Sequence, residues 1–270
     1  MKKFLFSIIT ACLNSAKTIG ETIESLQSQD ISPDLYEHIF IDGASQDNTL
    51  DIIRQKAKGN VVIVSEKDDG IYDAFNKGIK LAKGDFIYFL NSSDTLKSND
   101  VLSFVKTEIE KQPNTELIYG KVAYIRDNGT VRNLTGKQIT PENYWNPMEC
   151  ICHQGLFTKK SLFENIGLFK LHIKGGIADR IWLIDYFHKE PKGVVFIDKV
   201  IANFHAGGYA ESHAFEAALE NFIYVKDNLC FSEKVKNFIG LFRCFLLIKI
   251  LKAHKDTWFR RLYRKLRYGQ

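Results

Sequence analysis

The sequence lacks the features that would assign it to several large classes of protein. It has five cysteines, an odd number, and their spacings match no disulfide framework, so a reducing compartment is the simpler interpretation. No run of about 18 uncharged apolar residues occurs, and the sequence therefore predicts no simple transmembrane helix. Prolines are few, and no low-complexity tract or internal repeat is present.

The sequence also lacks a glycine-rich loop for binding phosphate. Neither the P-loop pattern nor the dinucleotide fingerprint follows any of its apolar, β-rich runs. The diphosphate of a bound nucleotide would therefore have to be neutralised by another group. A divalent cation is the usual alternative, because Mg²⁺ combines one or two carboxylates with phosphate oxygens.

Basic residues are concentrated at the C-terminal end of the chain. Residues 234–270 carry a charge of +10, whereas the whole chain carries +5 and residues 1–233 therefore carry −5. Aromatic and aliphatic side chains alternate with the basic ones, as in helices that lie in an anionic membrane interface. We expect this segment to bind an anionic membrane surface; the alternative is a helix packed on the body of the protein. Nucleic acid is not an expected partner, because no motif for binding it accompanies the charge.

The first half of the chain alternates β-rich runs with helical patterns. A length of 270 residues is enough for one large α/β domain with an appendage, or for two small domains. Strand–helix alternation predicts a parallel sheet with helices on both faces, and ligands bind such sheets beyond the carboxyl ends of the strands. The expected strands are residues 4–10, 38–41, 61–64 and 86–90, and the expected helices are residues 15–29, 49–58 and 71–83.

Acidic and small polar residues follow each of the four expected strands. These loops are residues 10–14, 42–49, 65–70 and 91–94. Single residues have simpler explanations, because Ser45, Asp47 or Thr49 could cap a helix and Gly43 could form a turn. Four consecutive strands that end in this way are harder to explain by caps alone, so we expect the loops to form one binding edge.

These loops resemble those of the family 2 inverting glycosyltransferases, whose fold is called GT-A. The resemblance covers about residues 4–210 and is most specific through residue 94. Weaker matches occur at His153, residues 167–169, Asp179 and residues 207–208. The segments that carry it are residues 7–14, 41–49, 65–78, 82–85 and 89–94.

The resemblance implies an α/β, GT-A-like (Rossmann-type) fold with a mostly parallel sheet flanked by helices. The GT-A domain would span residues 1–212, with a nucleotide-binding half at about 1–98 and an acceptor half at about 99–212. Residues 213–270 would form a helical, basic, amphipathic extension.

The resemblance also implies roles for individual residues. Asp94 resembles the metal-binding acid of the family, and His205 is a candidate second metal ligand, with a structural histidine as the alternative. Asp179 resembles the general base, with a helix cap as the alternative, and His153 would lie near the acceptor. The donor would be bound by Thr10, Asn14, Asp42, Asp68, Asp73, Asn76, Lys77, Ser92 and Ser93.

The chain departs from the family pattern at two positions. Ser93 stands where the family often has an acid beside the residue equivalent to Asp94. Ile181 stands where the family has the second acid of an Ala-Asp-x-Asp-Leu pattern, whereas Asp179 matches the retained first acid.

The implied activity is transfer of a sugar from a nucleotide sugar, UDP-linked by default, with inversion. Mn²⁺ or Mg²⁺ would be the cofactor, and the acceptor would be a saccharide or polyprenyl-linked molecule in bacterial cell-surface polysaccharide synthesis. One alternative is a sugar-phosphate nucleotidyltransferase, which would need a basic, glycine-rich loop at residues 11–15 that is absent here. The other is a non-catalytic nucleotide-sugar binding protein, altered at Ser93 and Ile181.

Overall fold

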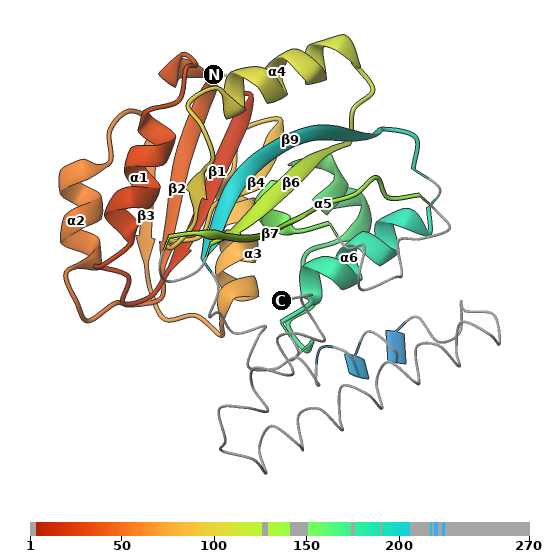
Figure 1. Ribbon diagram of the computed structural model, residues 1–270. Helices are drawn as coiled ribbons and strands as arrows, with labels where there is room; N and C mark the ends of the chain where they lie inside the picture. Colours follow the sequence, from red (N-terminus) through yellow and green to blue (C-terminus); the bar gives the residue numbers. More distant parts are fainter. Residues whose placement is uncertain are drawn as a thin grey trace, which may run out of the picture. The chain divides into compact units, whose positions relative to one another are not determined.

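A computed structural model describes most of the first 205 residues of the chain (Figure 1). The chain divides into two compact units, residues 1–172 with 178–207 and residues 173–177 with 208–270. All the helices and strands named below belong to the first unit. The expected membrane-binding segment, residues 234–270, lies outside the described residues. Those are residues 4–125, 129–140, 151–173, 176–189 and 191–205, together with 217, 219, 220, 223 and 224.

The strands form one mixed sheet in the order β3-β2-β1-β4-β8-β6-β9-β5, with β7 paired to β6. The four strands expected from the sequence run parallel to one another, while β8 is antiparallel to both β4 and β6. The α/β prediction is confirmed. The strands are β1 Phe6–Cys12, β2 Tyr36–Asp42, β3 Val61–Ser65, β4 Phe86–Phe89, β5 Thr95–Leu96, β6 Leu117–Ile125, β7 Val131–Thr135, β8 Leu156–Lys159 and β9 Val194–His205.

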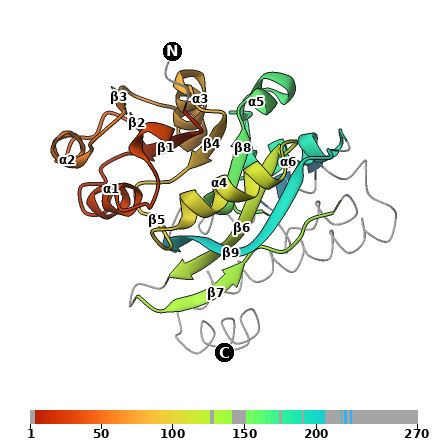
Figure 2. The same cartoon turned by 90° about the horizontal axis from the view of Figure 1, so that it is seen from above.

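Helices cover both faces of the parallel part of the sheet (Figure 2). Ile19 and Ile23 of α1 pack in one cluster with Cys12 of β1, whereas Gly78 of α3 lies against Ile9 of the same strand. Side chains three positions apart on a strand point to opposite faces, so α1 and α3 lie on opposite sides of β1. The helices are α1 Ile19–Gln27, α2 Thr49–Lys56, α3 Ile71–Leu81, α4 Val101–Lys111, α5 Ser161–Ile166 and α6 Ala178–Phe187.

A buried aromatic stack joins the parallel half of the sheet to β8. The rings of Tyr88 on β4 and Phe157 on β8 stack with their centroids 4.3 Å apart, and Phe6 of β1 packs against Phe157 at 5.4 Å. The Tyr88 hydroxyl donates to the carbonyl of Gln154, 2.7 Å away. The stack therefore also holds the turn that precedes β8.

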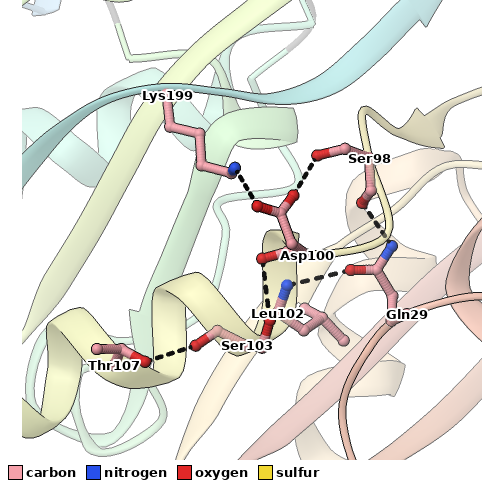
Figure 3. A network of polar contacts seen from close by, with 7 residues as sticks. All are labelled: Gln29, Ser98, Asp100, Leu102, Ser103, Thr107 and Lys199. Atoms are coloured by element: carbon pink, nitrogen blue, oxygen red, sulfur yellow. Dashed lines mark hydrogen bonds and ion pairs between the residues drawn. The ribbon is translucent and has the colours of Figure 1, made fainter.

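A polar network around Asp100 ties α4 to β9 and to the end of α1 (Figure 3). Lys199 of β9 donates to the Asp100 carboxylate at 2.8 Å, and Ser98 donates to it at 2.6 Å. Gln29 in turn donates to the Ser98 carbonyl and accepts from the backbone N–H of Leu102. The network lies beside the β5–β9 pairing, so it helps to hold the carboxyl end of β9 next to the loop that precedes β5.

We predict that replacing Phe157 by Ala lowers the free energy of unfolding by about 3–5 kcal/mol, because the substitution empties a fully buried site between two aromatic rings. Urea denaturation measures the change. Leu134→Ala is the matched control: Leu134 is 52% exposed on β7, so its truncation should change the free energy by less than about 1 kcal/mol. Equal losses in the two variants would contradict this account of the core.

Candidate active site

The polar loops after β1, β2 and β4 meet at one edge of the sheet. Cys12 at the end of β1 pairs with Asp42 at the end of β2, and Ile9 pairs with Phe89 at the end of β4. Parallel strands in this register bring their carboxyl ends together. The structure therefore brings these loops together, and their role in binding stays a prediction.

Hydrogen bonds join these loops to one another. The backbone N–H of Ser15 donates to the Thr49 hydroxyl at 2.7 Å, which links the loop after β1 to the start of α2. The Ser15 hydroxyl also bonds that of Ser92, 2.8 Å away in the loop after β4. Asn14 reaches the loop after β2, since its side-chain oxygen accepts from the backbone N–H of Gln46 at 2.8 Å. Asn14 and Ser92 therefore lie in one hydrogen-bonded surface.

Asp42 is fully buried and organises the loop that follows it. Its carboxylate accepts hydrogen bonds from the backbone and hydroxyl of Ser45 and, at 2.7 Å, from the hydroxyl of Ser65. Asp68 lies beside this loop, because a Cβ on Gly43 would come within 2.7 Å of its carboxylate. Asp42 and Asp68 are thus brought to the same corner, and Asp42 already bonds protein donors there.

Thr10 lies inside the sheet instead of on the loop surface. Its side chain is fully buried, and its hydroxyl bonds Nε2 of His38 at 2.8 Å. Burial lowers the pKa of His38 to about 3, so this imidazole is neutral and pairs with the hydroxyl without carrying charge. The structure therefore places Thr10 within β1, whereas Asn14, with which sequence reasoning grouped it, lies beyond the end of that strand.

The candidate donor-binding residues of α3 hold two neighbouring loops in place. The side-chain amide of Asn76 bonds the backbone of Phe169 in both directions, at 2.9 and 3.0 Å. Lys77 forms ion pairs with Glu66 at 2.9 Å and with Asp73 at 3.3 Å. These contacts fix the loop that carries Asp68 and the segment that precedes α6.

Asp94 carries a buried carboxylate with unused hydrogen-bonding capacity. The residue is fully buried, and neither carboxylate oxygen has a hydrogen-bond partner within the described part of the chain. Burial raises the pKa of Asp94 to about 6, and the nearby His153, Gln154 and His205 offset this only in part. A buried carboxylate without partners is costly unless something else pairs with it.

The surroundings of Asp94 fit a divalent cation. His205, at the end of β9, bonds the carbonyl of Ser93 through Nδ1 at 2.8 Å. Metal-binding histidines commonly use one ring nitrogen in this way and coordinate the ion with the other. No cluster of three or more candidate ligands occurs within the described ranges, so Asp94 and His205 would hold the ion together with ligands from phosphate or water.

Asp179, the first acid of α6, is held by three hydrogen bonds. Its Oδ2 is 3.0 Å from Nδ1 of His153, and its Oδ1 accepts from the Tyr72 hydroxyl and from the backbone N–H of Arg180, both at 2.8 Å. Burial disfavours the charged form, but the bonds from His153 and Tyr72 outweigh this and lower the pKa of Asp179. The carboxylate is therefore ionised at neutral pH and can accept a proton.

His153 joins Asp179 to the edge that carries Asp94. Because β8 is antiparallel to β4, the turn before β8 lies near the carboxyl end of β4. Nε2 of His153 is 3.1 Å from Nδ2 of Asn91 in the loop after β4. Sequence reasoning did not identify Asn91 or Tyr72, although both lie in the segments that carried the family resemblance.

Trp182 of α6 does not line this site. Trp182 packs against Phe163 at 4.8 Å and donates from its ring nitrogen to the carbonyl of Gly167, so it belongs to the core.

The described residues include no helix long and apolar enough to traverse a lipid bilayer.

We predict that Asp94→Asn stabilises the metal-free protein at neutral pH. Because the folded-state pKa of Asp94 is raised to about 6 from 3.8, its stabilising contribution is complete below about pH 4 and is lost as the pH rises through about 6. Urea denaturation in chelator at about pH 8 should therefore show a gain of at most roughly 3 kcal/mol, and the gain should shrink towards pH 4.

Asp51→Asn is the control for this prediction. Asp51 lies on α2 with a side chain that is 67% exposed, so its neutralisation should change stability by less than about 0.5 kcal/mol. Loss of stability in Asp94→Asn at both pH values would contradict the view that the carboxylate is buried without a partner.

Known proteins match most of this chain. A sequence model described as "Glycosyl transferase family 2" matches residues 7–167. The PGL/p-HBAD biosynthesis glycosyltransferase of Mycobacterium bovis is 30% identical over 210 residues, which cover 76% of this chain and 78% of that protein. The poly(ribitol-phosphate) beta-glucosyltransferase of Bacillus spizizenii is 30% identical over 199 residues, which cover 71% of this chain and 31% of that protein.

Solved structures share the fold. S. aureus TarS in complex with UDP-GlcNAc matches with a TM-score of 0.67 at 18% identity, covering 94% of this chain and 77% of that chain. The mannosyltransferase PcManGT from Pyrobaculum calidifontis, in complex with GDP-Man and Mn²⁺, matches with a TM-score of 0.65 at 15% identity, covering 97% and 79%. These likenesses establish the GT-A fold, and the match to residues 7–167 covers more than half of the sequence. The chain is therefore a member of glycosyl transferase family 2.

Proposed function

We propose that this glycosyltransferase moves a sugar from a nucleoside diphosphate sugar, UDP-linked by default, to a hydroxyl group of a saccharide or lipid-linked acceptor. The observation that carries the proposal is the pair of carboxylates Asp94 and Asp179, which His153 and Asn91 connect across one edge of the sheet. Asp94 has unused lone pairs for a cation, and Asp179 is ionised and partly exposed. Asp94 is therefore suited to hold a cation against the leaving diphosphate, and Asp179 is suited to accept the proton of the attacking hydroxyl.

The proposed reaction is a single displacement with inversion. The acceptor oxygen forms a bond to the anomeric carbon while the bond from that carbon to the diphosphate oxygen breaks, and its electron pair leaves with the nucleoside diphosphate. The proton of the acceptor hydroxyl passes to Asp179, which must lie within hydrogen-bond reach of it. A divalent cation held by Asp94 and His205 would supply positive charge to the departing diphosphate.

The donor half of the proposal rests on the loops after β1, β2 and β3. Asp68 and Asn14 lie at the surface of the edge and are candidates for contacts to the base and the ribose. Asp42 orders the loop beneath them through Ser45 and Ser65, so we assign it mainly to shaping the nucleotide site. Support for a UDP-linked donor comes from TarS, which was solved in complex with UDP-GlcNAc.

We further propose that residues 234–270 bring the enzyme to a membrane that holds its acceptor. The segment carries a charge of +10 together with aromatic and aliphatic side chains. Each basic residue near an anionic surface contributes about 1 kcal/mol of binding free energy. A lipid-linked acceptor would then lie in the same surface as the enzyme.

We predict that Asp179→Asn abolishes sugar transfer and leaves donor binding nearly intact. Asparagine keeps the shape of the side chain but cannot take the proton, and general-base catalysis typically contributes about 10²–10⁴-fold in rate. Release of nucleoside diphosphate in the presence of acceptor and Mn²⁺ measures turnover, and calorimetry measures donor binding.

Asp185→Asn is the matched control for this test, because it makes the same change on α6 at a residue that pairs with Lys170. It should keep wild-type turnover. If Asp179→Asn keeps most of the activity, the assignment of the base fails. If the wild-type protein binds donors but transfers no sugar to any acceptor, it is a binding protein and not a transferase.

We predict that deletion of residues 234–270 releases the protein from vesicles that contain anionic lipid, because the deletion removes a net charge of +10 and leaves residues 1–233 with −5. Co-sedimentation measures binding, with neutral phosphatidylcholine vesicles as the control. Unchanged binding of the truncated protein to anionic vesicles would overturn the membrane proposal.

A further inference from the structure

The hydrogen bonds to Asp179 distinguish its two oxygens. Oδ1 accepts from both the Tyr72 hydroxyl and the backbone N–H of Arg180, whereas Oδ2 accepts only from His153. Each carboxylate oxygen offers about two lone pairs. Within the described part of the chain, Oδ1 is therefore fully used and Oδ2 retains one lone pair for a further proton or donor.

The imidazole of His153 is itself fixed at both nitrogens. An ionised Asp179 only accepts hydrogen bonds, so Nδ1 of His153 must carry the proton of that bond. Nε2 then accepts from Nδ2 of Asn91 at 3.1 Å. In this arrangement both ring nitrogens have a partner, and the proton shared with Asp179 lies on Nδ1 of His153.

The protein holds this ring in place from three sides. His153 begins the short helical turn His153–Gly155, which the hydroxyl of Tyr88 binds through the carbonyl of Gln154. The ring also packs edge-on against Phe75, with centroids 5.7 Å apart. Asn91, which contacts Nε2 of the ring, accepts a hydrogen bond at its backbone carbonyl from the backbone N–H of Asp94.

We propose that His153 and Tyr72 are positioning residues that leave the free lone pair of Asp179 Oδ2 as the proton acceptor, and that His153 aligns it with the turn that carries Asp94. The inference rests on the proposed function, because it assigns roles around the same base. During transfer, the proton of the acceptor hydroxyl moves to Oδ2, and the proton on His153 Nδ1 stays where it is. His153 is therefore not the base.

Tyr72 has a distinct part in this arrangement. Tyr72 lies on the first turn of α3, which belongs to the donor half, and its hydroxyl donates to Asp179 Oδ1 at 2.8 Å. Burial and the adjacent Asp179 raise the pKa of Tyr72, so the phenol stays protonated and remains a donor. Tyr72 and His153 thus hold the two oxygens of one carboxylate from two separate segments of the chain.

A matched pair of variants at position 153 tests the inference. In His153→Asn the side-chain amide nitrogen can take the place of Nδ1, whereas in His153→Gln it takes the place of Nε2. We expect His153→Asn to keep kcat within about tenfold of wild type and His153→Gln to lose on the order of 10²-fold, since misplacement by about 1 Å costs that much. The donor KM should stay within a few-fold of wild type in both variants.

The pH profile provides a second readout. The base must be ionised, so kcat/KM falls as the pH drops through the pKa of Asp179. His153→Gln and Tyr72→Phe each remove a donor that lowers this pKa, so the acidic limb should move to higher pH in both variants and stay in place in His153→Asn. His188→Gln, which alters an exposed histidine after α6, is the control and should leave the profile unchanged.

The outcomes separate the two proposals. If wild-type protein transfers no sugar, the proposed function fails. If wild type is active but His153→Gln and Tyr72→Phe match it in kcat and acidic limb, the positioning roles are overturned. Inactivity of His153→Asn equal to that of Asp179→Asn would make the imidazole the base and would overturn the inference too. The fall in kcat in both His153→Gln and Tyr72→Phe could also follow from a loss of donor binding or of thermal stability. Both residues would then have only structural roles, and the inference would be overturned.

Discussion

The parallel pairing of β1 with both β2 and β4 decides where the candidate residues lie. It places the end of β2, with Asp42, and the loop after β4, with Asp94, on either side of β1. The antiparallel pairing of β8 with β4 then brings the start of β8 to the same edge, and with it His153. The residues proposed to act on the acceptor therefore depend on the same sheet as those proposed to bind the donor, and the aromatic stack between Tyr88 and Phe157 joins the two parts of the sheet.

The site places two carboxylates, Asp94 and Asp179, in surroundings that shift their pKa values in opposite directions. Asp94 has no described hydrogen-bond partner and its pKa is raised to about 6, whereas Asp179 has three donors and its pKa is lowered. The first arrangement is unfavourable for the protein alone and becomes favourable when a cation pairs with the charge. The second keeps a carboxylate ionised at neutral pH. Proteins retain such locally unfavourable groups where function needs them, at a cost in stability.

The first half of the fold could be predicted from the sequence because its signals are local. Alternating β-rich and helical periods identify β1 to β4 and the helices between them, and the polar loops follow directly. The pairing of β8 with β4 leaves no such pattern, since it joins segments about 70 residues apart. Thr10 was grouped with the loop residues, yet the structure buries it against His38, because β1 continues to Cys12 and Thr10 therefore lies inside the sheet. Tyr72 was missed because its bond to Asp179 joins residues 107 positions apart.

The central claim is that one edge of the sheet binds a cation and a sugar nucleotide at Asp94 and presents the acceptor hydroxyl to Asp179. A crystal structure of the full chain with Mn²⁺, UDP and an acceptor analogue tests it most directly, because the anomalous signal of manganese locates the ion. The account predicts one strong peak within coordinating distance of Asp94 and His205, with the diphosphate bound to the same ion. An ion and nucleotide bound elsewhere, or an acceptor hydroxyl out of reach of Asp179, would contradict it.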